Sequence, residues 1–493
     1  MFRKYEKVFA KDYENWYKES TEYRKQTEKD PRRLHFHLMP RTGWMNDPNG
    51  LCQLNGVYHI FYQYTPFEPT GELKLWGHFT TRDFIHYEDD GPVLYPDSEL
   101  DAHGAYSGSA YVEDGTMYVF YTGNLKYFDR EDYDYINSGR GSNTIQVVSR
   151  DGHHFSRKKL LMTTADYPAD MSCHVRDPKV FRRGARYYMV LGARDRESRG
   201  LVLLYESDDL EHWTFKSRIM TEEKFGYMWE CPDLFEIDGQ MFLTCCPQGV
   251  AQQGVDYANV HQCVWMKLDC NFAADQYRIR QIHQLDRGTD FYAPQTFQDE
   301  QGRRILIGWM GIPDADYTNP TTEAGWQHAL TLPRELTVRD GKLIQQPIAE
   351  LRQLRCEPVV CGSFDQDGCA ECVSEAKPQV YEASVTFDRC QSMRIELRDG
   401  VTLYYQDHML TLDPGDRGAG RTARSVRLEC LEDLQIFADT SSVEIFVNHG
   451  EEVFTSRIYS MEGGISIQGI CEGKMVIYPL KSFNVEDIWN DEE

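Results

Sequence analysis

The chain has 493 residues and a formal net charge of −25, with 41% hydrophobic and 13% aromatic residues. This length exceeds one ordinary hydrophobic core, so we expect at least two domains in a globular protein. The negative charge opposes binding to nucleic acid or to an anionic membrane, although a few local basic side chains can still hold one phosphate group.

The N-terminal extension, residues 1–33, mixes charged and aromatic residues and lacks the apolar run of a signal peptide. No window of the sequence reaches the roughly 20 apolar residues of a membrane-spanning helix. The 14 cysteines are scattered, which is typical of reduced cytosolic proteins, so we expect a cytoplasmic protein. A zinc site is the alternative to reduced thiols for one irregularly spaced cluster, Cys356, Cys361, Cys369 and Cys372.

One sequence pattern recurs five times between residues 34 and 335. Each copy has a polar motif, a short apolar stretch, a turn built on Gly and a run of β-branched and aromatic residues, which predicts a β-hairpin. The turn glycines are about 60 residues apart, which leaves room for the four strands of one propeller blade. We therefore predict an all-β fold whose catalytic domain, residues 34–335, is a five-bladed β-propeller. The polar motifs begin at Asp47, Ser107, Asp177, Glu230 and Ala293.

A second recurrence, at residues 81–87, 149–155 and 207–213, indicates one similar loop in each of three blades. Residues 336–355 are expected to form a linker that ends in a helix-compatible stretch. Residues 356–493 contain short alternating strands separated by turns, which is typical of an antiparallel β-sandwich.

Three of the five copies open the inner strand with a carboxylate: Asp47, Asp177 and Glu230. Because the first strands of propeller blades face the central channel, we expect these acids to converge at one end of it. An acid before Pro or Gly is commonly only a turn residue, but the coincidence in three copies favours a site. The other two copies offer hydrogen-bonding groups suited to a sugar, Tyr106, Ser107, Ser109, Asp290, Tyr292 and Gln295.

Cleavage of a glycosidic bond needs one ionised and one protonated carboxyl group. Crowded acids raise the pKa of at least one member, and Glu230, which has apolar neighbours in sequence, is the expected protonated acid. Asp47 is expected to stay ionised because Asn46 and the following turn supply donors. Asp177 is expected to be charged because Arg176 precedes it.

These motifs resemble those of glycoside hydrolase family 32, the invertases, sucrose-6-phosphate hydrolases and fructan hydrolases, from about residue 34 to the C-terminus. Segment 44–50 is similar to the family's nucleophile motif, 176–178 to its transition-state stabiliser and 230–232 to its acid/base motif. The resemblance implies a five-bladed propeller followed by a β-sandwich. It also implies double displacement with retention, in which Asp47 forms a fructosyl-enzyme and Glu230 protonates the leaving oxygen, without a metal or cofactor.

Further segments are similar to family motifs around the substrate, namely 61–64, 76–78, 106–110, 290–293 and 308–310. The sandwich part resembles the family at 441–447 and 455–459. The substrate-binding residues implied in this way are Asn46, Gln63, Trp76, Tyr106, Ser107, Arg176, Asp290, Tyr292 and Trp309. For Trp309 and Trp326, packing in the core is the alternative.

The sequence leaves the substrate open between sucrose, sucrose 6-phosphate and a short fructan. Residues 125–148 form a charged, aromatic insertion in which Lys126 and Arg140 are candidate phosphate ligands, with an ordinary solvated loop as the alternative. A fructosyltransferase with the same machinery, a propeller that only binds carbohydrate, and a propeller enzyme acting on arabinosides or xylosides remain competing hypotheses. A small sugar is the expected partner, and a homodimer through the sandwich stays open.

Overall fold

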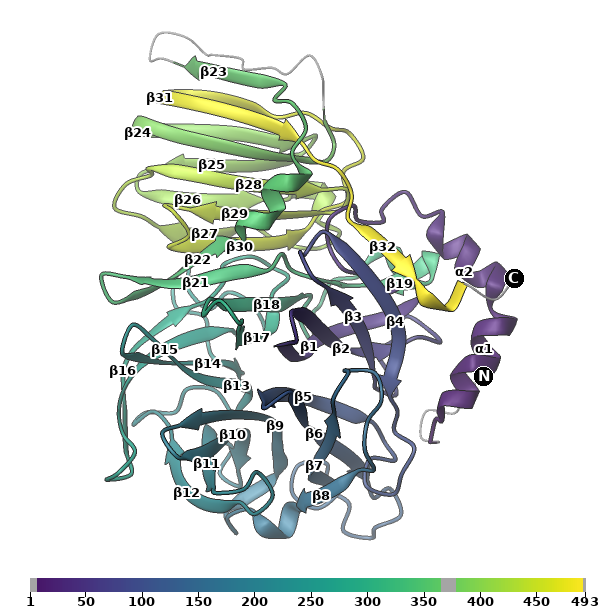
Figure 1. Ribbon diagram of the computed structural model, residues 1–493. Coiled ribbons are helices and arrows are strands. Elements are labelled where there is room, and N and C mark those ends of the chain that lie inside the picture. Colours follow the sequence, from purple (N-terminus) through teal and green to yellow (C-terminus); the bar gives the residue numbers. More distant parts are fainter. Residues whose placement is uncertain (1–6, 365–377, 491–493) are drawn as a thin grey trace.

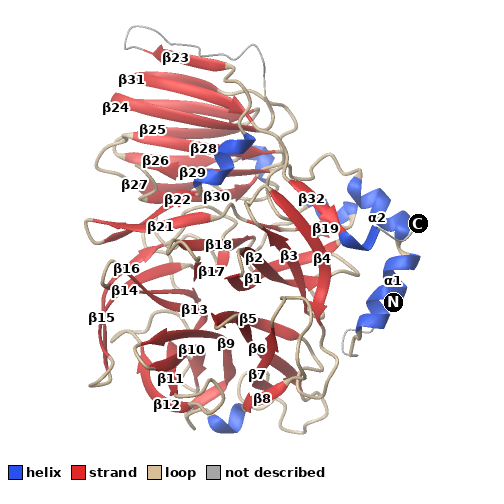
Figure 2. Ribbon diagram, in the orientation of Figure 1, coloured by secondary structure: helices blue, strands red, loops and turns tan. Residues whose placement is uncertain are grey.

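The computed structural model in Figure 1 describes residues 7–364 and 378–490. Strands dominate it, and the helices are few and peripheral (Figure 2). No described helix is both long enough and apolar enough to cross a bilayer. The helical elements are α1 (Ala10–Glu19), α2 (Thr21–Glu28) and the short 3-10 segments η1 (Thr164–Asp166), η2 (Pro320–Ala324), η3 (Ala349–Leu354), η4 (Gly415–Gly418) and η5 (Ile488–Asn490).

The described chain up to residue 347 is divided among five mainly antiparallel sheets, each built from consecutive strands. They are arranged as in a propeller, with the first strand of each sheet innermost (Figure 1). The first sheet contains β1 (Gly43–Leu54), β2 (Val57–Thr65), β3 (Leu75–Thr81) and β4 (His86–Leu94), with β19 (Trp326–Gln327) and β32 (Asn484–Asp487) at its edges.

The other four sheets follow in chain order. The second has β5 (Ala105–Glu113), β6 (Thr116–Lys126), β7 (Arg140–Ser149) and β8 (Lys159–Met162), and the third has β9 (Met171–Arg183), β10 (Arg186–Asp195), β11 (Gly200–Ser207) and β12 (Thr214–Ile219). The fourth has β13 (Met228–Ile237), β14 (Gln240–Gln248), β15 (Val264–Asn271) and β16 (Gln276–Gln284). The fifth has β17 (Tyr292–Gln298), β18 (Arg304–Met310), β20 (Ala329–Leu330), β21 (Arg334–Arg339) and β22 (Lys342–Pro347).

The inner hairpins turn where the sequence predicts. Asn55 and Gly56 have φ values of 53° and 75°, and Asp114 and Gly115 have 49° and 67°. Two consecutive positive φ angles define the tight turn whose twist matches that of paired strands, and Asn or Asp followed by Gly adopts it with little strain. Local chemistry therefore fixes the register of these hairpins.

Every inner strand is interrupted by a β-bulge. The pairing register shifts between Met45 and Pro48 in β1, and at the corresponding places in β5, β9, β13 and β17. A bulge adds a residue to one strand and redirects the side chains there. Asp47 and Asp177 lie in two of these bulges, and Glu230 directly precedes a third.

The C-terminal sheet forms the sandwich. Its longest strand, β24, pairs with β31 along one edge and with β28 and then β25 along the other, so two layers diverge from it. An apolar core fills the space between the layers. The strands are β23 (Val360–Phe364), β24 (Tyr381–Arg398), β25 (Val401–Gln406), β26 (Met409–Asp413), β27 (Arg424–Arg427), β28 (Asp433–Asp439), β29 (Ser442–Val447), β30 (Glu452–Arg457) and β31 (Ser466–Pro479).

Three segments differ from the simple succession of extension, propeller, linker and sandwich. Strand β22 lies inside the segment expected to be a linker and completes the fifth sheet, while the helix-compatible stretch forms η3. Strand β32 returns from the sandwich to pair in parallel with β4. Of the cysteine cluster, Cys369 and Cys372 lie outside the described residues, and Cys356 is an exposed free thiol.

Candidate active site

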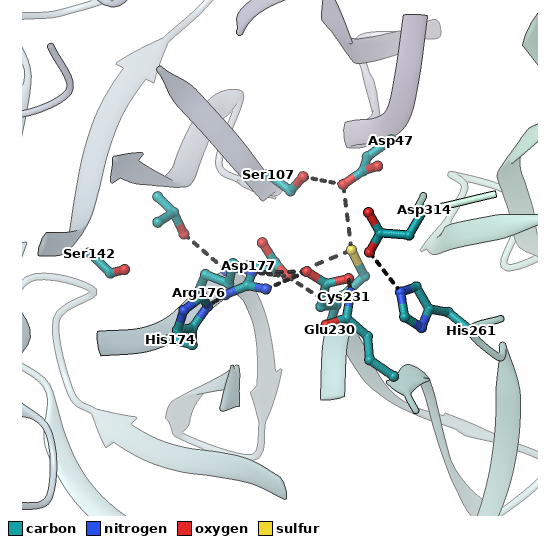
Figure 3. A network of polar contacts seen from close by, with 12 residues as sticks. Asp47, Ser107, Ser142, His174, Arg176, Asp177, Glu230, Cys231, His261 and Asp314 are labelled. Carbon is teal, nitrogen blue, oxygen red and sulfur yellow. Dashed lines mark hydrogen bonds and ion pairs between the residues drawn. The ribbon is translucent and has the colours of Figure 1, made fainter. Parts of the chain in front are cut away.

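The bulge of β1 carries Asp47, whose carboxylate is held by neighbouring donors (Figure 3). The Ser107 hydroxyl donates to Oδ2 of Asp47, and the Asn46 amide donates to Oδ1 over 2.9 Å. Gln63 closes the ring, because its amide nitrogen donates to Ser107 over 2.7 Å and its amide oxygen accepts from Asn46 over 2.7 Å. Four residues that the sequence marks for the site therefore fix one another.

Asp177 occupies the bulge of β9 with φ of 63°. Its backbone N–H donates to the Thr122 hydroxyl over 2.9 Å, and its Oδ2 accepts the backbone N–H of Cys231 over 2.9 Å. The thiol sulfur of Cys231 lies 3.7 Å from Oδ2 of Asp47 and 3.7 Å from Oδ2 of Asp177. The structure thus brings Asp47 and Asp177 to either side of one cysteine (Figure 3).

Glu230 stands one residue before the bulge of β13, whereas Asp177 is the first residue and Asp47 the second residue of its own bulge, so the three acids occupy three different slots. Its Oε1 accepts from Nε of Arg176 over 3.1 Å and from Nη2 of the same guanidinium. Its Oε2 accepts from the Tyr292 hydroxyl over 2.7 Å and from the Gln248 amide over 2.8 Å. Arg176, Glu230 and Tyr292 each precede the bulge of their own strand, which explains why they meet.

The acids differ in their readiness to ionise. Burial raises the pKa of Asp47, although hydrogen bonds from Ser107 and Asn46 oppose the shift. Burial raises the pKa of Asp177 to about 7, with Arg176 opposing the shift and Glu230 adding to it. Burial also disfavours the charged form of Glu230, but Arg176 outweighs it and lowers the pKa of Glu230.

These contacts correct two expectations about charge. Arg176 was expected to keep Asp177 ionised, but its Nε is 4.0 Å from Oδ2 of Asp177 and its hydrogen bonds go to Glu230. Glu230 was expected to be the protonated acid, but in the free site it is the ion-paired one. The reason is geometric. Arg176 and Asp177 are adjacent in β9, so their side chains point in different directions, and the Arg176 guanidinium extends to Glu230 on β13.

The aromatic residues expected at the site line its walls. Trp76 is buried and donates from Nε1 to the backbone oxygen of Tyr106 over 3.1 Å, so it positions that half-buried ring. Trp309 is buried beside Trp44, with 6.0 Å between ring centroids. Trp44 remains partly exposed and donates from Nε1 to Asn46 over 2.8 Å.

Asp290 does not join the acid cluster. Its carboxylate is fully buried and is bound by two nitrogens of Arg421 from the sandwich, each at 2.7 Å. The backbone N–H of Arg457 donates to the same carboxylate over 2.9 Å. The expected substrate-binding side chain is therefore engaged between the propeller and the sandwich.

Sequence reasoning missed several residues of the site. Lys74 lies 4.9 Å from the ring centre of Trp44, and burial lowers its pKa to about 7 while Asp47 opposes the shift. Gln248 binds Glu230, and the His174 ring nitrogen Nδ1 lies 2.8 Å from Nη1 of Arg176. Lys74 and His174 each stand two residues before a recognised residue, so strand alternation was the signal that could have found them.

One group of side chains that could bind a metal ion is formed by residues other than the three acids. In the described ranges, ligand atoms of His78, Asp90 and His153 lie within 4.8 Å of one another. His78 and Asp90 are on β3 and β4 of the first sheet, and none of the three touches the acid cluster. The chemistry available at the acids themselves is that of carboxyl groups.

Among the described residues, Asp47 is partly exposed with no cation at ion-pair distance, and Glu230 is partly exposed and paired with Arg176. Asp177 is a third, buried acid. Carboxyl groups in this arrangement can cleave a glycosidic bond. Together with the propeller and sandwich they define a glycosidase. The chain belongs to glycosyl hydrolases family 32: the N-terminal domain of that family matches residues 37–347 and its C-terminal domain matches residues 366–485.

Relatives and solved structures agree with this family. A sucrose-6-phosphate hydrolase of Bacillus subtilis is 37% identical, covering 90% of this chain and 92% of the relative, and one of Salmonella typhimurium is 36% identical, covering 92% and 94%. The structure of sucrose-6-phosphate hydrolase from Lactobacillus gasseri superposes with a TM-score of 0.85 at 29% identity, covering 97% and 99%. A mutant of the family 32 β-fructofuranosidase of Bombyx mori, solved in complex with sucrose, gives 0.80 at 28% identity, covering 95% and 98%.

Proposed function

We propose that this enzyme cleaves the β-fructofuranosidic bond of sucrose or sucrose 6-phosphate and releases fructose with retention of configuration. Asp47 is the nucleophile that forms the fructosyl-enzyme, and Glu230 is the general acid and then the general base. Asp177 stabilises the charge that develops in the transition state. The catalytic carboxyl groups alone carry this chemistry, so the proposal includes no metal or cofactor.

The observation that carries the assignment is the difference in access among the three acids. Asp47 and Glu230 are partly exposed, whereas Asp177 is buried and bonded to backbone. A nucleophile and a proton donor must touch the substrate, but a stabilising charge acts from behind it. Only Asp47, held in place by Ser107 and Asn46, is both accessible and free of an arginine in ion-pair contact.

The ion pair with Arg176 keeps Glu230 ionised in the free enzyme, so the acid takes up its proton from solvent when substrate binds. Arg176, which the family resemblance assigns to fructosyl hydroxyls, leaves Glu230 as it turns to the sugar. Loss of that positive charge raises the pKa of Glu230, because burial is then opposed mainly by the weaker effect of the Tyr292 hydrogen bond. The acid is thereby protonated in the complex rather than in the free enzyme.

The test is hydrolysis of sucrose by Asp47→Asn and Glu230→Gln variants. Each is expected to keep the fold, as judged by circular dichroism, and to lose about 10⁴-fold or more in kcat. Glu236→Gln, an exposed change on the same strand that carries Glu230, should keep normal turnover. Near-normal activity in either of the first two variants would remove that residue from the mechanism.

Retention has its own test. With methanol added as acceptor, a double displacement yields methyl β-fructofuranoside, which NMR distinguishes from the α anomer. An α product would refute a covalent fructosyl-enzyme. At high sucrose concentration, accumulation of fructosyl oligomers instead of free fructose would favour the fructosyltransferase alternative.

The sucrose-type substrate is favoured over a fructan because several similar proteins are sucrose-6-phosphate hydrolases. We also infer a cytoplasmic location, which the free cysteines of the described chain support, including Cys246 and Cys263 with sulfurs 3.3 Å apart. Thiol titration of freshly isolated protein under denaturing conditions tests this, since an oxidised pair would contradict it.

We further infer that the five sheets are the five blades of one propeller, with the helical extension before residue 34 and the sandwich after residue 356. A β-bulge in the first strand of each of the five sheets supports this. A crystal structure with one of these sheets outside the ring would contradict it.

A further inference from the structure

Two arginines near the acid cluster have no carboxylate partner in the part of the chain that the structure describes. Arg140, at the start of β7, donates to the Asn124 amide oxygen over 2.6 Å and to the Tyr135 hydroxyl over 3.0 Å. Arg194, near the end of β10, donates to a serine hydroxyl and lies 4.7 Å from the ring centre of Tyr227. The Nε atom of each is buried without a hydrogen-bond acceptor.

His174 lies beside Arg176 (Figure 3) and is also within electrostatic reach of Arg140 and Arg194. Burial, followed by the charges of Arg176, Arg140 and Arg194, lowers the pKa of His174 to about 2. The charge of Arg176 is matched by Glu230. Within the described residues, neither of the other two guanidiniums has a carboxylate at ion-pair distance, which is unusual in a protein whose net charge is −25.

The two arginines lie near the reaction centre, where Arg140 is buried and Arg194 and Tyr135 reach solvent. Arg140 is 5.6 Å from the ring centre of Tyr106, and both Tyr106 and Tyr227 are within electrostatic reach of Glu230. The Tyr135 side chain is half exposed, at 48%, and Arg194 is partly exposed.

The loop that follows β6 brings these groups together. It carries Tyr135 and reaches Arg194, whose charge lowers the pKa of Asp134 after the larger effect of hydrogen bonds within the loop. Both oxygens of Asp134 accept hydrogen bonds from Ile136 and Asn137, and within the described residues this acid forms no direct ion pair with Arg194. The insertion thus places the half-exposed Tyr135 hydroxyl between a buried arginine, Arg140, and the neighbourhood of a partly exposed one, Arg194.

We infer that Arg194, the Tyr135 hydroxyl and Arg140 bind the phosphate of a phosphorylated glucosyl leaving unit, so that sucrose 6-phosphate is preferred over sucrose. This inference rests on the proposed function. A phosphate monoester carries about −1.5 to −2 charges at pH 7, which two unpaired guanidiniums neutralise. Because Arg140 donates to the Tyr135 oxygen, the hydroxyl proton of Tyr135 is free to be donated to the phosphate.

The experiment compares kcat/KM for sucrose 6-phosphate and for sucrose in the wild-type enzyme and in Arg194→Gln. A charge-assisted hydrogen bond contributes about 1.5 to 3 kcal/mol, so the variant should lose roughly 10- to 100-fold on the phosphorylated sugar. Its kcat/KM for sucrose should change less than about threefold. Equal losses on both sugars, or no loss on either, would overturn the inference.

Matched variants isolate the contribution of the phosphate. Arg196→Gln removes an exposed arginine two positions along the chain and should leave the preference unchanged. Tyr135→Phe removes only the hydroxyl and should lower the preference for the phosphorylated sugar without affecting sucrose. Raising the ionic strength should also reduce the wild-type preference, because the interaction is between charges.

The outcomes separate this inference from the proposed function. A wild-type enzyme that hydrolyses sucrose and sucrose 6-phosphate equally well would contradict phosphate binding and leave the fructosidase chemistry intact. An enzyme that cleaves neither sugar would refute the proposed function itself. Competitive inhibition by glucose 6-phosphate, weakened in Arg194→Gln but not in Arg196→Gln, supports the site independently of turnover.

Discussion

At the scale of single residues, Arg176 decides the charge state of the site. Its guanidinium could pair with either neighbouring acid, and the structure gives it to Glu230. Asp177 is left buried with a carboxylate that, among the described residues, accepts hydrogen bonds only from the backbone N–H and the thiol of Cys231, and burial raises its pKa to about 7. With three acids in a small space, the ionised form of Asp177 therefore destabilises the folded protein.

Because ionised Asp177 destabilises the folded protein, we expect Asp177→Asn to raise stability by an amount that depends on pH. The folded-state pKa of Asp177 exceeds its unfolded value of about 4, so its contribution to stability is greatest below pH 4 and falls as pH rises to about 7. Asn cannot ionise and tolerates the positive φ of this position. The variant should be inactive on sucrose, with a Tm above that of wild type at pH 8 and a smaller advantage at pH 5.

The control for this prediction is Asp114→Asn, in an exposed hairpin turn with φ of 49°. It makes the same chemical change at the same kind of backbone position without relieving a buried charge. Its Tm should follow wild type at both pH values. An Asp177→Asn advantage that is independent of pH would show that the buried charge is not its origin.

At the scale of elements, the loops after β3, β7 and β11 share one design. In the third, Oδ1 of Asp209 accepts the backbone N–H groups of Glu211 and His212, each over 2.9 Å, and Oδ2 lies 2.7 Å from Nδ1 of His212. These bonds lower the pKa of Asp209. The sequence recurrence at 81–87, 149–155 and 207–213 is therefore a turn-forming motif rather than a part of the catalytic site.

We expect Asp209→Ala to lower the Tm by about 1 to 4 °C at neutral pH, since two backbone donors lose their acceptor. A lowered carboxyl pKa stabilises the fold above the unfolded pKa of about 4, and the benefit is lost as pH falls through the folded value. The difference from wild type should therefore shrink in acid. Asp208→Ala, an exposed neighbour, should change the Tm little, and sucrose hydrolysis should be normal in both.

Some features of the strands and of the site could be predicted from the sequence, and others could not. The hairpins, their turns and the clustering of Asp47, Asp177 and Glu230 follow from local patterns and a repeat, so they could be predicted. The offset of Glu230 by one residue could not, because a bulge depends on pairing with the next strand. The partner of Arg176 and the burial of Asp290 likewise depend on neighbours far away in the chain.

At the scale of the whole molecule, the sandwich supports the active site from outside. Arg421 of the sandwich holds Asp290, and two residues further along the same segment Tyr292 donates to Glu230. Both side chains of the Arg421–Asp290 pair are fully buried. Removing one partner of such a pair leaves an uncompensated charge in the interior.

Arg421→Met should therefore destabilise the protein by about 3 to 5 kcal/mol and reduce kcat as well. Thermal denaturation and sucrose hydrolysis measure the two effects. Arg417→Met provides the control, because Arg417 is an exposed arginine whose ion pair with Asp399 lies at the surface. Normal kcat in a folded Arg421→Met enzyme would show that the sandwich does not position Tyr292.

The parallel pairing of β32 with β4 also has a consequence for how the chain is made. Strand β4 is synthesised early, yet its edge partner leaves the ribosome about 400 residues later. At about 5 to 20 residues per second, that edge stays unpaired for roughly 20 to 80 seconds of translation. During that interval a nascent chain exposes strand-pairing groups to its neighbours on the same polysome.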